Sequence, residues 1–459
     1  MRASLVFLLV ALLALAAFAL GRRRALAAAG RSRLHSLPGY YGWYAALWCG
    51  LPGLAIALAW ALFASSALDR LTLGSTPGRA AASKSEQALF LNDVRNLASG
   101  ESASADAPAD PEVAQAAARY TEARQRGLAA ACTLAVLLSL AGGALALRRV
   151  APSLPARVAV ERVLAHILLL SSAFAILVTA GIVFSLIFEA GRFFERVSPV
   201  DFLFGLEWSP QTAIRADQVG SSGAFGAVPV FAGTLLITAI AMAVAVPIGL
   251  LSAIHMGFYA SPRVRAVAKP ALEVLAGVPT VVYGFFAALM VAPAIRALGE
   301  AAGLSVASES ALAAGLVMGI MIIPFVSSLS DDAITAVPLS LRDGSFGLGA
   351  TRSETIRHVI VPAALPGIVG GVLLAVSRAI GETMIVVMAA GLAANLTANP
   401  LEAVTTVTVQ IVSLLTGDQE FDSAKTLSAF ALGLVLFSVT LVLNVLALRA
   451  VKRHREKYD

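Results

Sequence analysis

Long runs of apolar residues are the feature that most constrains the fold of this chain. A helix needs about 20 mostly apolar residues to cross the hydrocarbon core of a bilayer, and nine runs approach that length. Charged residues make up 14% of the 459 residues, whereas a soluble domain carries about a quarter. We therefore predict an all-α fold, a polytopic transmembrane helical bundle embedded in a lipid bilayer. The predicted spans are 4–20, 44–63, 128–147, 165–188, 229–256, 272–294, 311–329, 366–390 and 424–448.

The charges between the runs predict how the chain crosses the membrane, because cytoplasmic loops carry an excess of lysine and arginine. Four basic segments fall on the cytoplasmic side if the N-terminus lies outside and the C-terminus inside. On the opposite side, segment 391–423 has four acidic residues and neither lysine nor arginine. The net charge of +6 thus reflects topology, and we expect no nucleic-acid partner. The basic segments are 21–43, 148–164, 257–271 and the tail 449–459.

Segment 64–127 differs from the runs on either side, because it is rich in alanine, serine and aspartate and mixed in charge. Residues 100–112 have a composition typical of disorder, and 113–126 can form a short helix. We interpret the segment as an extramembrane tether with a small helical cap, in preference to a binding module.

The loop before the eighth run is nearly balanced in charge, unlike the other cytoplasmic loops. Ser340, Asp343 and Ser345 are candidate helix starts, and Gly347 and Gly349 suit a turn between two short helices. An apolar stripe then begins at Ile356. We predict an amphipathic two-helix elbow at the cytoplasmic surface. A helix resting on lipid is the alternative, but such helices favour lysine and arginine, so the neutral charge favours docking onto a protein.

The eighth run, 366–390, contains one charged pair, Arg378 and Glu382. Pro362 and Pro366 are expected to stop the elbow just before this run. A spacing of four places Arg378 and Glu382 on one helix face, and ionisable residues inside a span often mark a pathway. The planar arginine fork suits phosphate oxygens, and Glu382 would hold it in place. The alternative is an intrahelical ion pair that only offsets its own burial cost.

The predicted elbow and the eighth run both resemble segments of a known family. The stretch from Gly349 to Pro362 is similar to the coupling helix of type I ABC importer permeases, with Asp343-Gly344-Ser345 where the family usually has Glu-Ala-Ala. The stretch from Gly370 to Met384 resembles the phosphate-specific, PstC-type permeases. The segments 231–249, 275–286 and 416–423 are similar to the same subfamily, so that the resemblance covers about residues 160–459.

The resemblance implies a role for individual residues. The pathway residues would be Arg378, Glu382 and Thr383. The residues that contact a separate ATPase would be Asp343, Gly347, Gly349, Ala350, Thr351, Glu354, Ile356 and Pro362.

The resemblance also implies the domain organisation, a six-helix permease core preceded by three extra spans. We expect an N-terminal extension over residues 1–160, a first core span and periplasmic loop over 161–228, and the type I permease domain over 229–448. The tail 449–459 would be cytoplasmic. The protein would lie in a bacterial inner membrane, with its N-terminus in the periplasm.

The implied function is that of the permease subunit of an ATP-driven phosphate importer. Its partners would be a homologous permease in a heterodimer, two ATP-binding subunits and a periplasmic phosphate-binding protein. No Gly-x-x-x-x-Gly-Lys-[Ser/Thr] motif occurs, so ATP hydrolysis would reside in partner chains. We predict no enzyme activity, cofactor or metal in this chain. The alternatives are a sulfate or molybdate permease, an ion-coupled carrier, and a membrane phosphate-signalling sensor that uses segment 64–127.

Overall fold

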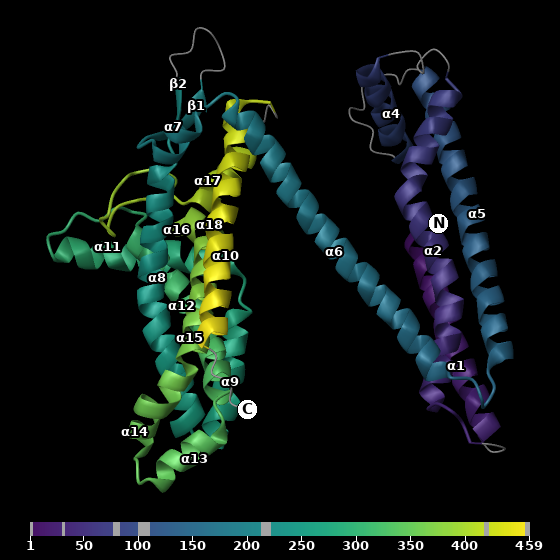
Figure 1. Ribbon diagram of the computed structural model, residues 1–459. Helices are drawn as coiled ribbons and strands as arrows, with labels where there is room; N and C mark the ends of the chain where they lie inside the picture. The colour runs from purple at the N-terminus through teal and green to yellow at the C-terminus, as the bar shows by residue number, and fades with distance from the viewer. Residues whose placement is uncertain are drawn as a thin grey trace. The chain divides into compact units, whose positions relative to one another are not determined.

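The computed structural model describes residues 3–29, 33–76, 83–99, 111–212, 222–416 and 422–454, and they are almost entirely helical (Figure 1). Nine helices in these ranges are long and apolar enough to cross a membrane. The predicted all-α transmembrane architecture and the number of spans are therefore confirmed. The chain divides into two compact units, Met1–Ile176 and Leu177–Asp459.

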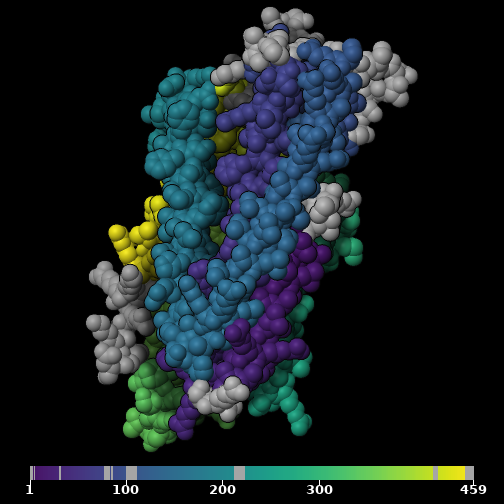
Figure 2. Space-filling view, turned by 90° about the vertical axis from the view of Figure 1, so that its right-hand side faces the viewer, coloured from purple at the N-terminus to yellow at the C-terminus, as the bar shows by residue number. Residues whose placement is uncertain are grey.

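The first unit is built around α2 (Pro38–Gly74), which packs against both α1 (Ala3–Ala29) and α5 (Pro111–Arg149). Glycine permits these contacts: a Cβ atom on Gly142 would lie 2.0 Å from the backbone oxygen of Trp48. Small residues at such crossings let membrane helices approach closely, because helix association in lipid depends on packing. Helix α5 is blue in Figure 2. It carries exposed leucines suited to lipid, among them Leu137 and Leu140.

Segment 64–127 is more helical than its composition suggested. Helix α2 continues to Gly74, α4 occupies Lys84–Ser99, and α5 already begins at Pro111. The predicted helix 113–126 exists, but it forms one continuous helix with the third membrane span. Of the stretch 100–112, residues 111 and 112 are helical rather than disordered, and 100–110 lie outside the described residues. A small apolar core that includes Leu68, Phe90 and Val94 holds the three helices together, so the segment is a folded cap rather than a tether.

The second unit is centred on α12 (Ala311–Thr335), which packs against α8 (Val228–Ile254) and α15 (Val361–Ile380). A Cβ atom on Gly319 of α12 would lie 2.9 Å from the backbone oxygen of Ala241, so these helices meet almost backbone to backbone. Helix α18 (Ala424–His454) packs along α15 (Figure 1). Helix α6 (Ala156–Phe194) belongs to both units, because the boundary falls within it.

Shorter elements complete the second unit. Strands β1 (Trp208–Thr212) and β2 (Ser222–Phe225) form an antiparallel pair. The remaining elements are α7 (Pro199–Phe204), the π-helix η1 (His255–Tyr259), α9 (Pro262–Ala276), α10 (Thr280–Phe286), the π-helix η2 (Ala287–Val291), α11 (Ala292–Ala301), α13 (Leu339–Gly347), α14 (Arg352–Thr355), the π-helix η3 (Ile356–Ile360), α16 (Met384–Ala389) and α17 (Val407–Leu415).

Two predicted spans are not single helices. In 272–294, α9 ends at Ala276 and a new helix starts at Thr280, after a glycine and a proline. In 366–390, α15 ends at Ile380, and α16 begins only at Met384. Broken helices at membrane depth are tolerated where they are buried in protein or line a water-filled cavity. We therefore expect a cavity or buried protein contacts beside both breaks.

The prediction that Pro362 and Pro366 stop the preceding helix is also wrong. The span runs from Arg352 to Ile380 through both prolines. The π-helix η3 ends immediately before this point, and proline lacks the N–H that would bond back to the preceding turn. A π turn changes the hydrogen-bond register locally, which lets the helix continue.

Candidate functional site

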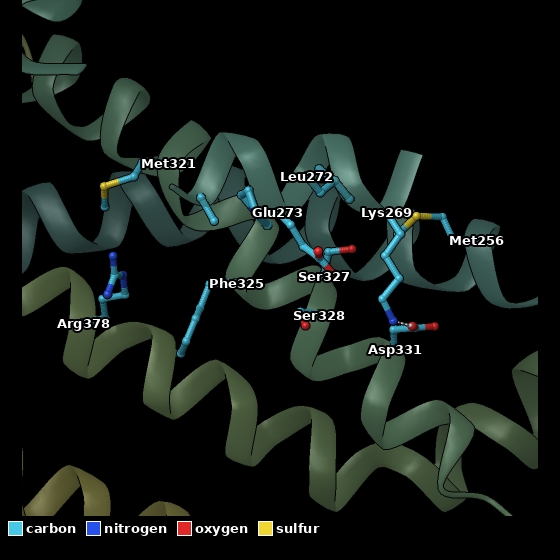
Figure 3. A pocket seen from close by; sticks show the side chains of 12 residues that line it. Met256, Lys269, Leu272, Glu273, Met321, Phe325, Ser327, Ser328, Asp331 and Arg378 are labelled. Carbon is cyan, nitrogen blue, oxygen red and sulfur yellow. Dashed lines mark hydrogen bonds and ion pairs between the residues drawn. The ribbon is translucent and has the colours of Figure 1, made fainter. Parts of the chain in front are cut away.

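A cavity of about 360 Å³ lies in the second unit, between α9, α12 and the end of α15 (Figure 3). Its lining combines cationic, carboxylate and hydroxyl side chains, which can bind a small ionic solute. It is lined by Met256, Lys269, Leu272, Glu273, Ala276, Met321, Pro324, Phe325, Ser327, Ser328, Asp331 and Arg378.

Arg378 stands in the last turn of α15 and lines this cavity. Its guanidinium carbon lies 5.8 Å from the centre of the Phe325 ring, a cation–π distance. Within the described part of the chain, no ion pair joins Arg378 to Glu382. The expectation that both residues share one helix face is wrong, because Gly381 caps α15 between them.

Glu382 instead organises the break between α15 and α16. Its Oε1 accepts hydrogen bonds from the backbone N–H groups of Met384 and Ile385, at 3.1 and 3.4 Å. Thr383 donates its hydroxyl to the carbonyl of Gly381 at 3.3 Å. The carboxylate therefore satisfies donors at the start of a helix, as N-terminal caps do. The sequence offered this signal, since a glycine followed by an acid and a threonine is typical of one helix ending and another beginning.

Asp331 is the charged centre that sequence reasoning missed. It is 3% exposed, and its carboxylate accepts from Arg265 Nη2 at 3.2 Å and from Lys269 Nζ at 3.1 Å. Both cations come from α9, so this cluster fixes the broken helix to α12. A buried carboxylate needs such partners, because an unpaired buried charge is strongly destabilising. Figure 3 shows the Lys269–Asp331 pair and Arg378 toward opposite ends of the cavity.

Two hydroxyl groups lie between these charges. Ser327 and Ser328 both line the cavity, and the Ser327 Oγ is buried without a hydrogen-bond partner within the described residues. A buried polar group without a partner is uncommon and marks a place where a water or solute is expected. Together with Arg378 and Lys269, the serines provide donors to oxyanion oxygens, and Glu273 and Asp331 limit the positive charge.

The predicted two-helix elbow is present at 339–360, with the turn at Gly349. Gly349 has φ = +87°, a left-handed conformation that glycine adopts without strain. Thr351 and Glu354 form a reciprocal capping box, with the Thr351 N–H donating to Glu354 Oε2 at 2.8 Å. The predicted starts at Asp343 and Ser345 are wrong, because α13 begins at Leu339, next to the third candidate Ser340, and ends at Gly347.

The elbow is held rigidly to the end of the bundle. Ile356 and Ile360 are buried, and Ile360 joins an apolar cluster with Ile334 of α12 and Val337. The hydroxyl groups of Ser345 and Thr355 lie 2.9 Å apart, which ties the two short helices together. The elbow therefore packs against the ends of α12 and α15.

The outer face of the elbow is open. Leu348 is 91% exposed, a large apolar side chain at the tip of the turn. Ala350 is partly buried and Ile356 is buried. The other predicted coupling residues are exposed, namely Asp343, Gly347, Gly349, Thr351, Glu354 and Pro362.

Two family models match parts of this chain. A family model described as a phosphate ATP-binding cassette transporter matches residues 7–178. A second, described as a binding-protein-dependent transport system inner membrane component, matches residues 245–456. Among solved structures, a chain of an inward-facing methionine ABC transporter covers 50% of this chain and 95% of its own length, at 15% identity and a TM-score of 0.37.

Three curated relatives are similar over more than half of this chain. The probable ABC transporter permease protein YqgH of Bacillus subtilis is 32% identical over 260 residues, which is 57% of this chain and 80% of the relative. The phosphate transport system permease protein PstC 1 of Mycobacterium tuberculosis is 31% identical, over 56% of this chain and 83% of the relative. PstC of Mesorhizobium japonicum is 29% identical, over 54% and 76%. The chain therefore belongs to the PstC-type family of inner-membrane permease components of ATP-binding cassette transport systems.

Proposed function

We propose that this chain forms the translocation pathway of an ATP-driven phosphate importer, with Arg378 as the group that contacts the anion. The observation that carries the proposal is the position of Arg378, a cation with no carboxylate partner among the described residues, on a cavity that also holds two serine hydroxyls. Several relatives are named phosphate transport permeases, which supports phosphate as the anion.

A missing motif and an exposed surface support the proposed assembly with partner chains. No P-loop motif occurs in the sequence, so the nucleotide would bind to separate ATPase subunits. The exposed elbow at 339–360 would dock onto one of them, with Leu348 as its apolar contact. None of the residues of α9 is fully buried, so this helix offers surface for packing against a second, homologous permease. A binding protein would deliver phosphate from the periplasm, where we place the N-terminus.

Nucleotide-driven movement of the ATPases would pull the elbow and, through Ile360, the ends of α12 and α15. Arg378 stands in the last turn of α15 and Asp331 in the last turns of α12, so such movement changes the cavity itself. The two states of the transporter must differ in affinity for the anion, since only a differential interaction can drive the change.

Uptake of radiolabelled phosphate by the assembled transporter in proteoliposomes tests the pathway. Arg378→Ala is expected to lower uptake about tenfold or more, because a charge-assisted contact to the anion is lost. Arg296→Ala is the matched control, since Arg296 pairs with Glu300 at 2.9 Å outside the cavity and uptake should be unchanged. Normal uptake by the Arg378 variant would refute the pathway role.

The same preparation separates the competing functions. Excess sulfate or molybdate should not displace phosphate if the assignment is right. Vesicles that lack the ATPase should show no uptake, whereas an ion-coupled carrier would still transport.

A further inference from the structure

A second cavity, of about 450 Å³, lies in the first unit between α2, α4 and α5. No role proposed above uses this cavity. Its volume falls within the range of ~300–1,000 Å³ that small-molecule sites have. It is lined by Trp60, Ala61, Ala64, Ser65, Leu68, Asn92, Arg95, Asn96, Ser99, Tyr120, Arg124 and Leu128.

The cavity lies at the level where the membrane ends. Helices α2 and α5 have 37 and 39 residues, so each is about 55–60 Å long and extends well beyond a hydrocarbon core of about 30 Å. Their apolar runs end near residue 63 and begin near residue 128, which is where the cavity lies. Trp60 and Tyr120 line it, and these two residue types concentrate at membrane–water interfaces.

Helices α2 and α5 pack closely beside the cavity. Trp60 lies against Gly127, where an added Cβ atom would be 2.1 Å from the indole ring. Helix α4 packs against α5 and forms the third wall of the cavity. The cavity is therefore formed by the fold of the cap itself.

Positive charge is in excess on its walls. Arg95 is fixed by Asp69 of α2, with Nε donating to Oδ1 at 3.3 Å and Nη2 contacting Oδ2. Arg124 makes no hydrogen bond or ion pair to any described residue, so one of the two guanidinium groups has no counter-charge. The side chains of Ser65, Asn92 and Asn96 likewise have no hydrogen-bond partner within the described ranges, and they add neutral donors.

We propose that this cavity binds a phosphate group, held by Arg124 and Arg95 and by the amide and hydroxyl groups around them. Guanidinium is the side-chain group best matched to phosphate oxygens. An excess of one positive charge matches the single negative charge of a phosphodiester. The group can come from an anionic phospholipid headgroup, whose acyl chains would lie along exposed Leu58 and Leu62 of α2, or from free phosphate.

Two binding measurements on the full-length chain test the site and separate the two sources. The first is native mass spectrometry of phosphatidylglycerol retained after transfer from nanodiscs. The second is equilibrium dialysis of lipid-depleted protein with radiolabelled inorganic phosphate. Arg124→Gln is expected to weaken binding of the true ligand about tenfold, because one charge-assisted contact is lost. Arg124→Lys keeps the charge and should weaken it less.

Arg126→Gln is the matched control, because Arg126 lies on the same helix but pairs with Glu122 at 2.6 Å and does not line the cavity. Arg124-dependent retention of the lipid identifies a headgroup site, and Arg124-dependent binding of inorganic phosphate identifies a soluble-anion site. The proposal is overturned if neither probe binds in an Arg124-dependent way, or if the Arg126 variant loses as much. Because the site is in the first unit, its failure would leave the pathway role of Arg378 untouched.

Discussion

The two units of this protein cross the membrane with different kinds of helix. In the first, α1, α2 and α5 run without interruption, and α2 and α5 continue beyond the membrane into a folded cap. In the second, the chain breaks between α9 and α10 and again between α15 and α16. Unbroken helices satisfy their own backbone groups, whereas breaks require protein or a water-filled cavity around them. This difference supports the two proposals made above, transport by the second unit and ligand binding by the first.

The largest expected effect comes from forcing helices apart in either unit. In Gly142→Val of the first unit, the new side chain would clash with the Trp48 backbone oxygen, and in Gly319→Val of the second with that of Ala241. Each should destabilise its unit by about 3 kcal/mol. Thermal unfolding and phosphate uptake, measured together, should show reduced stability in both variants but loss of uptake only for Gly319→Val.

Gly181→Val is the control for those variants, because a Cβ atom there would meet open space. Loss of uptake in Gly142→Val at a temperature where the protein is still folded would break the division of roles between the units.

Loss of the buried Asp331 carboxylate has the next largest expected effect on stability. Asp331→Asn should lower the free energy of unfolding by about 2 kcal/mol, less than for a fully buried pair because both cations are partly exposed. Asp332→Asn changes the neighbouring, exposed carboxylate and should have little effect. Equal melting temperatures for the two variants, measured by thermal unfolding in detergent, would show that the cluster does not fix α9 to α12.

The capping role of Glu382 predicts a smaller effect, which depends on a hydrogen-bond acceptor at this position rather than on its negative charge. Glu382→Gln keeps an oxygen that can accept from the Met384 and Ile385 N–H groups. Glu382→Ala leaves both N–H groups without this acceptor and should lower the free energy of unfolding by about 1 kcal/mol. Uptake and thermal stability should therefore fall in the alanine variant and be largely retained in the glutamine variant. If glutamine abolishes uptake without affecting stability, the negative charge itself acts in the pathway, as the sequence-based hypothesis held.

The smallest effect concerns pH just before the N-terminal end of α18. The hydrogen bond from Arg192 holds the pKa of the Asp422 carboxyl below its ordinary value. A lowered folded-state pKa contributes stability above the unfolded pKa of about 3.9, and this contribution is lost as pH falls through the folded value. The difference in melting temperature between the natural chain and Asp422→Asn should thus be present at pH 6 and shrink toward pH 3. A difference that stays constant over this range would refute the linkage.

Much of this fold was predictable because membrane spans are encoded locally. The number of spans followed from apolar runs, and the elbow with its turn at Gly349 followed from glycine spacing and an apolar stripe. Helix ends within apolar segments were not predictable in the same way. The run 366–390 was read as one span because it is apolar overall, although the local sequence Gly381-Glu382-Thr383 is typical of one helix ending and another beginning.

The sequence by itself determined the membrane architecture and the family, since the length of an apolar run and a short motif are local properties of the chain. Only the tertiary structure decided which charges meet. Asp331 pairs with Arg265 and Lys269, which precede it by 66 and 62 residues, while Glu382, four positions from Arg378, turns away to cap a helix. The physical reason is that burial compels a charge to find the partner that packing brings near, whatever its distance along the chain.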